Sequence, residues 1–269
     1  MTLRIRFAKY GALRFIGHLD VMRYFQKVIR RADLPVRYSQ GFTPHQIMTF
    51  AHPLSLGVSS DAEYMEVDFA EELDEREVFD RMSAQMSEGF ALLSCSKLPE
   101  VPEGTHRDSL MSLVSAAEYM ISWKDGYSEV PGEDRLRAAI GEFFSGESIV
   151  VEKSTKKTTE DTDIKPYIYR IYPQGDAFLD AEDPGFYGDK NITRSFAEGI
   201  DNTAHADTFE NGRKFFVCVA SGSAMNIKPA LVTEALCGVL GIEYNRHAFA
   251  LHRMETYKRI GGNLVPLDM

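Results

Sequence analysis

Apolar and polar residues alternate in two stretches of the first 70 residues, which predicts strands. Residues 3–7 change between apolar and polar side chains at every position, and residues 63–69 do so apart from the adjacent Tyr64 and Met65, which is the period of a half-buried strand. Between them, an apolar stripe recurs at three- and four-residue spacing and predicts a helix over 19–32 with that stripe toward the core. The stripe consists of Leu19, Met22, Phe25, Ile29 and Ala32. Pro35 ends this helix, because proline cannot continue one.

The order of the predicted elements indicates the fold class. A strand at 3–7, which we expect to continue through 13–16 after a bend, is followed by the helix and by extended pieces at 36–38 and 47–50. The strand at 63–69, a helix at 74–88 and a strand at 90–95 complete a β-α-β-β-α-β order. A similar order returns later, with helices at 133–144 and 228–240 and strands at 117–123, 148–153, 167–172, 215–220 and 249–253. We therefore predict an α+β fold with two ferredoxin-like units in tandem.

The boundaries of these two units follow from composition. Residues 98–109 are rich in proline, glycine and acidic residues, which favours a linker between a first domain over 1–98 and a second over 110–269. Residues 176–212 are rich in Asp, Glu, Gly and Asn and break the pattern of the second half. We interpret them as an acidic insertion in the second domain. They lack the residue spacing of a calcium-binding loop.

Composition excludes several classes of protein. The chain has 269 residues, 44% of them apolar, and lacks both a long apolar run and a signal-peptide pattern, so we expect a cytoplasmic protein without a membrane segment. Cys95, Cys218 and Cys237 lie far apart, which is typical of reduced thiols and not of an iron–sulfur site. Glycine-rich nucleotide motifs are absent. We expect no cofactor and no metal.

Charge is distributed unevenly along the chain. Residues 1–50 contain nine basic and two acidic residues, a charge of +7, whereas the whole chain carries −10, so the remainder carries −17. This asymmetry favours a surface that faces a polyanion. The alternative is a helix with an ordinary solvated basic face.

The segment from Arg37 to His45 combines residue types that suit nucleic-acid binding. Aromatic side chains stack on bases, and glycine permits close approach of the backbone. Basic side chains on the preceding helix can contact phosphates. The binding candidates are Arg14, Arg23, Lys27, Arg30, Arg31, Arg37, Tyr38, Gln40, Gly41 and Phe42. The signature of an ordinary RNA-recognition motif is absent.

Histidines in the same region leave catalytic alternatives open. His18, Asp20 and His45 are the candidates for acid–base work on RNA, since imidazole titrates near neutral pH. A metal site with His52 or Glu63 is a second alternative, although the spacing fits no compact metal motif. Ser39 as a nucleophile lacks the glycine-flanked elbow of hydrolases.

Several short segments resemble one family. These segments are residues 13–20 with Met22 and Arg23, 30–32, 34–35, 38–42, 44–45, 53–54, 56–58 and 63–64. They resemble the radical-SAM-linked bacterial proteins of unknown function known as the DUF2344 family. A weaker resemblance to the same family lies at residues 155–157, 163–167 and 228–229. The resemblance implies the stand-alone form of a protein that acts beside a radical-SAM enzyme. The family usually has serine in place of Gly17, and a Pro-Lys pair in place of Gln46 and Ile47.

These observations lead to a ranked set of functional hypotheses. We expect a non-catalytic RNA-binding or substrate-presenting accessory module with a radical-SAM partner. A protein–protein adaptor is the first alternative. A histidine-dependent RNA-processing enzyme, or a metal-dependent one, built on His18, Asp20 and His45 is the second.

Overall fold

The chain folds into two compact units. The computed structural model describes residues 1–102, 104–105, 107–154, 159–173, 187–188, 202–223 and 225–269. Unit 1 consists of residues 1–115, 193–206 and 253–269, and unit 2 consists of residues 116–192 and 207–252. Residues 253–269 therefore belong with the first part of the chain, although the sequence pattern groups them with the second half.

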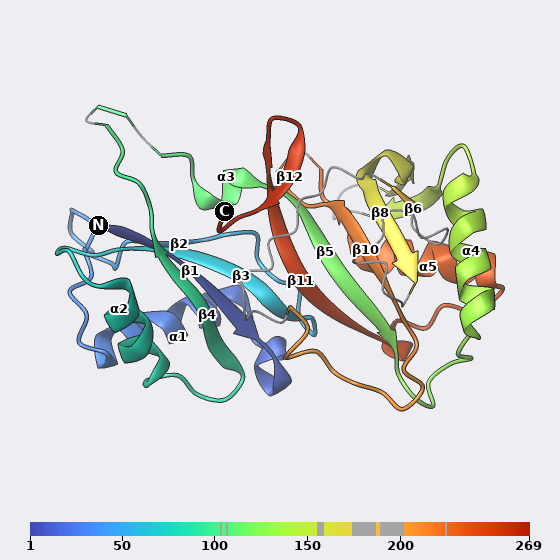
Figure 1. The fold of residues 1–269 in the computed structure, drawn as a ribbon, viewed down its shortest axis with the longest axis horizontal. Coiled ribbons are helices and arrows are strands. Elements are labelled where there is room, and N and C mark those ends of the chain that lie inside the picture. Colours follow the sequence, from blue (N-terminus) through green and yellow to red (C-terminus); the bar gives the residue numbers. More distant parts are fainter. Residues whose placement is uncertain (103, 106, 155–158, 174–186, 189–201, 224) are drawn as a thin grey trace. The chain divides into compact units, whose positions relative to one another are not determined.

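Unit 1 combines an antiparallel sheet with three α-helices and a 3-10 helix (Figure 1). Its helices are η1 (Gly11–Phe15), α1 (His18–Arg31), α2 (Glu75–Ser83) and α3 (Leu110–Leu113). Its strands are β1 (Thr2–Lys9), β2 (Met48–Phe50), β3 (Ser59–Asp68), β4 (Phe90–Lys97), β12 (Asn263–Pro266) and the part of β11 (Phe249–Ile260) from Arg253 onward. Strand β1 lies between β3 and β4, β2 pairs with β3, and each of these pairs is antiparallel.

Both faces of the unit 1 sheet are covered. On one face, Leu3, Ile5 and Phe7 of β1 pack against α1 and α2. On the other face, Tyr64 packs with Leu110, Val114 and Leu267. Neighbouring residues Tyr64 and Met65 thus point into different cores, as the alternating pattern of this strand predicts. Because both faces are covered, polar side chains of the central strands are buried as well.

Unit 2 also combines helices with antiparallel strands. Its helices are α4 (Glu133–Ser145), α5 (Pro229–Leu240), η2 (Lys165–Tyr167) and η3 (Arg246–Ala248). Its strands are β5 (Val114–Trp123), which begins in unit 1, β6 (Val150–Ser154), β7 (Thr159–Asp163), β8 (Ile168–Pro173), β9 (Tyr187–Gly188), β10 (Lys214–Ala220) and the first residues of β11. The strand order is β5-β10-β8-β9, and β6 and β7 form a separate hairpin.

The structure confirms the α+β class and most of the predicted elements, with three corrections. Residues 13–16 do not extend the first strand, since Gly11 has a φ of 54° and begins the 3-10 helix η1. Leu19 is 59% exposed, because Val21 and Val28 complete the buried face of α1 in its place. The last strand does not end at Arg253 but continues to Ile260, where Gly261 and Gly262 turn the chain into β12.

Most of the acidic insertion expected at 176–212 lies outside the described residues. Residues 202–212 are described as turns and bends, and Asn202 and His205 contact unit 1 side chains. Among the described residues, no helix is long and apolar enough to cross a membrane.

Candidate functional site

A narrow polar cavity lies in unit 1 at the N-terminal end of α1. Its volume is about 20 Å³, enough for one water molecule. Segments that are far apart in the sequence line it, namely the end of β1, the start of α1, the loop after β2 and the middle of β3. The side chains that can do chemistry there are Lys9, His18, Glu63 and Tyr64. His18, Pro53, Leu54, Glu63 and Tyr64 all come from the segments that carry the family resemblance, so those segments meet in space.

Lys9 is the cation of this cavity. It is the last residue of β1 and is only 3% exposed. Its Nζ donates a hydrogen bond of 2.8 Å to the carbonyl oxygen of Ile16. Burial lowers the pKa of Lys9, Glu63 raises it in part, and Arg253 lowers it further. The charged state of this amine therefore depends on the carboxylate that shares the cavity.

Glu63 is held by an arginine from the end of the chain. Arg253 Nη1 lies 3.0 Å from Glu63 Oε1, and the same nitrogen donates to the carbonyl oxygen of His52 at 3.0 Å. Burial lowers the pKa of His52, Arg253 lowers it further and Glu63 raises it in part, so the surroundings favour the neutral imidazole. Glu63 thus lies near two buried cations, Lys9 in the lining of the cavity and Arg253 outside that lining.

The predicted catalytic residues are not assembled. His18 is the first residue of α1, and its ring meets Phe50 edge-on at a centroid distance of 5.3 Å. Asp20 pairs with Arg23 at 3.2 Å on the helix surface, and His45 Nδ1 lies 2.9 Å from Ser39 Oγ in an exposed loop. Within the part of the chain that the structure describes, His18, Asp20 and His45 share no hydrogen bond or ion pair, and no three potential metal ligands cluster.

The loop over residues 37–46 presents two aromatic side chains to solvent. Phe42 is fully exposed and Tyr38 is 49% exposed. A backbone bridge between Tyr38 and Gln46 and the bond from the His45 backbone nitrogen to Ser39 Oγ, at 3.1 Å, hold the base of the loop. Gly41 has a φ of 116°, which only glycine adopts freely, so the tip depends on this residue.

The loop runs beside α1. Gln46 is buried and its Nε2 donates to the carbonyl oxygen of Gln26 in the middle of that helix, at 3.3 Å. On α1 the side chains of Arg23, Lys27, Arg30 and Arg31 are exposed, and in the loop Arg37 and Gln40 are exposed. Arg31 also donates to the carbonyl oxygen of Gln85 at 3.0 Å. We call Tyr38, Phe42, Arg37 and the four basic residues of α1 the loop–helix surface. Arg14 lies apart from it in η1, half-buried, with its guanidinium carbon 5.1 Å from the Phe15 ring centroid.

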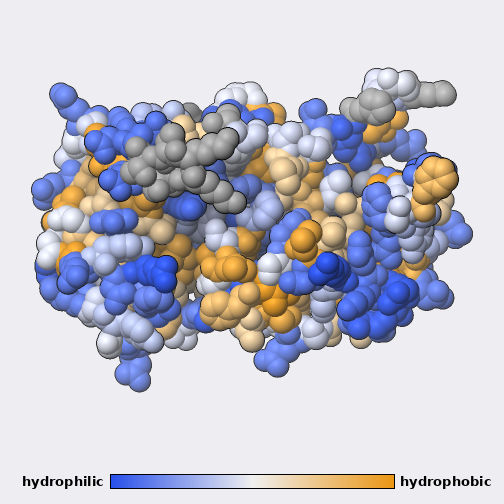
Figure 2. Space-filling view, turned by 180° about the vertical axis from the view of Figure 1, so that it is seen from behind, coloured by the Kyte–Doolittle hydropathy of each residue, from blue (hydrophilic) through white to orange (hydrophobic). Residues whose placement is uncertain are grey.

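The basic excess of residues 1–50 is reduced by folding. Arg4, Arg6 and Lys9 are buried, and Arg4 and Arg6 pair with Glu66 and Glu255 at 2.6 and 3.0 Å. Unit 1 as a whole carries a formal charge of −3 and unit 2 carries −7, which together give the −10 of the chain. Hydrophobic and hydrophilic residues are interspersed on the face of the molecule in Figure 2. Within residues 1–50, the exposed basic side chains are therefore those of the loop–helix surface.

Sequence reasoning missed a buried polar network around Arg6. Its guanidinium donates to Glu255 at 3.0 Å, to Asn202 Oδ1 at 2.9 Å and to the carbonyl oxygen of Asp61 at 2.8 Å, and it lies 3.4 Å from Asp268. Tyr64 also donates to Glu255, at 2.8 Å. The only signal for this network in the sequence is the alternation of charged and apolar residues in β1. That alternation predicts equally well a strand whose charged side chains face solvent.

A second missed feature is an aspartate–histidine pair. Asp61 is fully buried and accepts from the backbone nitrogen of His205 at 3.1 Å, and His205 Nδ1 lies 2.6 Å from its other oxygen. The Tyr10 ring covers the imidazole at a centroid distance of 4.2 Å. The two residues are 144 positions apart, so no local pattern could have joined them.

The cavity and the loop–helix surface, both in unit 1, differ in the size of the molecule that can reach them. The cavity holds an amine, an imidazole and a carboxylate, a set that can move protons, but its volume admits only water. The loop–helix surface has no enclosed site, and its aromatic and basic side chains are open to a macromolecule. The arrangement therefore favours binding at the surface over reaction in the cavity.

A comparison with protein-family models assigns most of the chain to a family. The model of a family described as an uncharacterized protein conserved in bacteria, DUF2344, matches residues 2–203. No curated protein matches the chain.

Proposed function

Because the chain belongs to the DUF2344 family, we propose that it is a non-catalytic module that binds RNA, or presents an RNA substrate, beside a radical-SAM enzyme. The RNA part of the proposal rests on the loop–helix surface. The enzyme partner rests on the resemblance of the sequence to radical-SAM-linked proteins. The closed cavity at the start of α1 supports a binding role, because it leaves no room for a substrate.

The observation that carries the proposal is the exposure of two aromatic rings in a loop that contacts the basic helix α1 through Gln46. A fully exposed phenylalanine leaves apolar area in water, which is unfavourable unless a partner covers it. Bases of single-stranded RNA stack on such rings, and each stacked base contributes about 1–3 kcal/mol. Phe42 and Tyr38 lie in one loop, so they can take up neighbouring bases of the same strand.

The charges of the loop–helix surface fit the phosphates of such a strand. Four basic side chains of α1 and Arg37 are exposed, and the acidic neighbours in the same segment are Asp20 and Asp33. Arg23 is already paired with Asp20, which leaves Lys27, Arg30 and Arg37 as the phosphate contacts that we propose. This excess of basic over acidic side chains supports a moderate, salt-sensitive affinity for RNA.

We also infer that both units are ferredoxin-like. In unit 1, β1 is flanked by β3 and β4, and β2 pairs with β3. In unit 2, β10 lies between β5 and β8, and helices α4 and α5 follow β5 and β10 in the chain. These orders agree with a split β-α-β unit, in which two helices cover one face of an antiparallel sheet.

The experiment that tests the proposal is fluorescence anisotropy with a labelled single-stranded RNA of mixed sequence. We expect binding that weakens as salt is raised from about 50 to 200 mM, because cations released from phosphates oppose it. Replacing the three proposed phosphate contacts Lys27, Arg30 and Arg37 with glutamate should weaken binding by at least about tenfold. Arg31 is left in place, since its bond to Gln85 supports the fold.

The matched control places the same charge change elsewhere. Lys27→Glu and Lys228→Glu both reverse one exposed lysine, the first on α1 and the second before α5 in unit 2. We expect only Lys27→Glu to lower the affinity for RNA. Equal effects of both variants would show that only net charge matters. An absence of binding at low salt would overturn the proposal in favour of a protein adaptor.

A further inference from the structure

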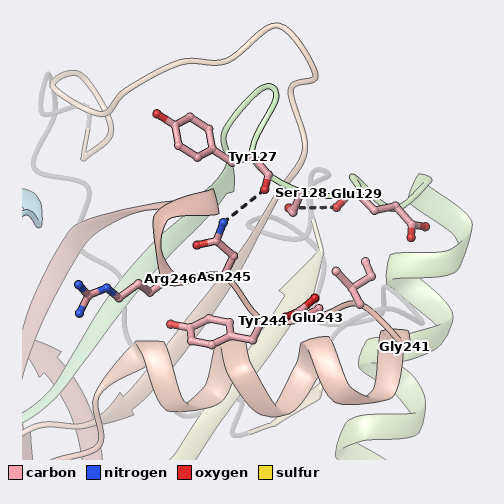
Figure 3. Close-up of a pocket in the computed structure, with 9 residues that line it drawn as sticks. Tyr127, Ser128, Glu129, Gly241, Glu243, Tyr244, Asn245 and Arg246 are labelled. Carbon is pink, nitrogen blue, oxygen red and sulfur yellow. Dashed lines mark hydrogen bonds between the residues drawn. The ribbon is translucent and has the colours of Figure 1, made fainter.

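Two clefts of the chain differ in whether their polar groups are already used within the chain. The wider one lies in unit 2, between the turn after β5 and the loop after α5, and has a volume of about 710 Å³ (Figure 3). Its Glu129 pairs with Arg135 of α4, and Asn245 Nδ2 donates to the carbonyl oxygen of Tyr127 at 3.4 Å. The charges at this groove therefore favour no particular class of ligand.

The second cleft lies in unit 1 and has a volume of about 270 Å³. It is lined by the start of β1, the loop between β3 and α2, the end of β4 and parts of the segment that follows β4, together with Arg37 from the base of the exposed loop. The backbone nitrogen of Leu98 donates to the carbonyl oxygen of Thr2 at 3.0 Å and holds that segment beside the N-terminus (Figure 1). Sites for drug-sized ligands have about 300–1,000 Å³, so this cleft fits a somewhat smaller molecule or one residue of a chain. We call it the β1–β4 cleft.

Two arginines of the β1–β4 cleft keep most of their donors for a ligand. Arg37 is exposed, and among the residues that the structure describes its side chain has no hydrogen bond or ion pair. Arg107 is half-buried and donates to the carbonyl oxygen of Pro99 through one nitrogen of its guanidinium. Planar guanidinium groups with free N–H donors match the geometry of a phosphate. The cleft therefore has the donors that a phosphate group needs.

Two carboxylates provide acceptors at the same cleft. Glu72 Oε2 lies 2.5 Å from Lys97 Nζ, and this hydrogen bond is the main cause that raises the pKa of Lys97. The charge of Glu100 raises the same pKa further, so Glu100 also lies near this amine. Glu100 is exposed and, within the described part of the chain, has no hydrogen bond or ion pair of its own. An ionised carboxylate can only accept, so Glu100 suits a ligand with hydroxyl donors.

A ribonucleotide carries the groups that match both kinds of side chain. Its phosphate accepts hydrogen bonds and attracts cations, whereas its ribose hydroxyls can donate. Three basic and two acidic side chains line the cleft, a charge of +1, although unit 1 as a whole carries −3. An inorganic anion would meet the carboxylates with nothing to donate to them. The mixed lining therefore fits a ribonucleotide better than a simple anion.

The hydroxyls indicate which part of an RNA strand enters the cleft. An internal nucleotide has a free hydroxyl only at 2′, whereas the 3′-terminal nucleotide has neighbouring hydroxyls at 2′ and 3′. Arg37 belongs to the loop–helix surface and also lines the cleft, so the cleft adjoins that surface. We propose that the β1–β4 cleft binds the 3′-terminal ribonucleotide of the RNA, with its phosphate on Arg37 and Arg107 and its hydroxyls on Glu100. This inference rests on the proposed function and names the part of the RNA that is recognised.

The test uses fluorescence anisotropy with two 5′-labelled single-stranded RNAs that differ only at the 3′ end. One ends in an ordinary ribonucleotide, and the other ends in a 2′,3′-dideoxynucleotide, which keeps the length and the charge and lacks both hydroxyls. We expect the full chain to bind the first RNA at least about tenfold more tightly, because hydrogen bonds to an ionised carboxylate are strong. Glu100→Ala should reduce this preference to less than about threefold, and Arg107→Gln should weaken the binding of both RNAs about three- to tenfold.

The control variant is Glu88→Ala, which removes the same side chain from an exposed position of unit 1 outside the cleft. We expect it to keep the preference for the 3′ hydroxyls. Equal affinity for the two RNAs would overturn the inference and leave RNA binding by the loop–helix surface standing. An unchanged preference in Glu100→Ala would also overturn it. If neither RNA binds at low salt, the proposed function itself fails, which distinguishes that outcome from the other two.

Discussion

The basic residues of β1 and those of α1 are close in sequence but have opposite surroundings. Arg4 and Arg6 are buried in the sheet and paired with carboxylates, whereas Lys27 and Arg30 on the helix are exposed. Burying a charge is costly unless it is paired, so the strand arginines must be matched by acids, whereas the helix residues need no partner. The same residue types thus pair with carboxylates in the interior in one element and face solvent in the next.

The largest expected effect comes from removing a strand arginine. Arg6→Met leaves Glu255 and Asp268 buried without their cation, so we expect a loss of about 3–5 kcal/mol in the free energy of unfolding. The matched change on the helix, Arg23→Met, breaks only an exposed pair and should cost no more than about 0.5 kcal/mol. Urea denaturation followed by circular dichroism measures the loss of stability in both variants. Similar losses in the two variants would contradict the expected difference between β1 and α1.

The next effect concerns pH. Burial raises the pKa of Glu255 to about 7, although Arg6 beside it lowers the pKa in part. A carboxyl that holds its proton more tightly in the folded state contributes stability at low pH and loses it as pH rises from about 4.5 to 7. The change amounts to about 3 kcal/mol at most. Glu255→Gln should flatten this dependence in urea denaturations at pH 5 and 8, and an unchanged pH dependence would contradict the assignment.

A third prediction concerns Phe42, an exposed residue of the loop–helix surface. Phe42→Ala should lower the affinity for single-stranded RNA about tenfold, because one base loses its stacking partner. The free energy of unfolding should change by less than about 0.5 kcal/mol, since the ring is fully exposed. Anisotropy and urea denaturation of the same preparation separate the two. A loss of stability with no loss of affinity would place Phe42 in the fold and not in binding.

The smallest expected effect is that of a single helix lysine. Lys27→Met should reduce the slope of the logarithm of RNA affinity against the logarithm of salt by about 0.7, the contribution of one phosphate contact on a single strand. Stability should again change by no more than about 0.5 kcal/mol. Lys228→Met, at an exposed position before α5, should leave the slope unchanged.

Local sequence patterns predicted most of the individual helices and strands. The helical periodicity of α1, apart from the exposed Leu19, and the positions of β3, α2, β4 and α5 agree with the structure. The end of β11 could not be predicted, because Arg253 and Glu255 are buried there and a strand with charged residues in its interior resembles a surface segment. Their partners, Glu63 and Arg6, are about 190 and 249 residues away.

The candidate site was predictable only in part. The exposed loop with Tyr38 and Phe42 follows from a glycine and a proline between polar residues, which are local signals. The cavity required Lys9, His18 and Glu63 to be brought together by the pairing of β1 with β3 and by the packing of α1. The expectation that His18 and His45 act together was based on nearness in sequence, and the helix between them separates their surroundings.

The position of residues 253–269 in unit 1 has a consequence for synthesis. Arg4 and Arg6 have early acceptors in Glu66 and the carbonyl oxygen of Asp61, but Glu255, Leu267 and Asp268 follow them in the chain by 249 to 263 residues. While a nascent chain ends before β11, Arg6 therefore lacks the two carboxylates that it pairs with in the folded protein. Unit 1 can complete this network only after residues 253–269 have been synthesised, although most of its residues emerge much earlier.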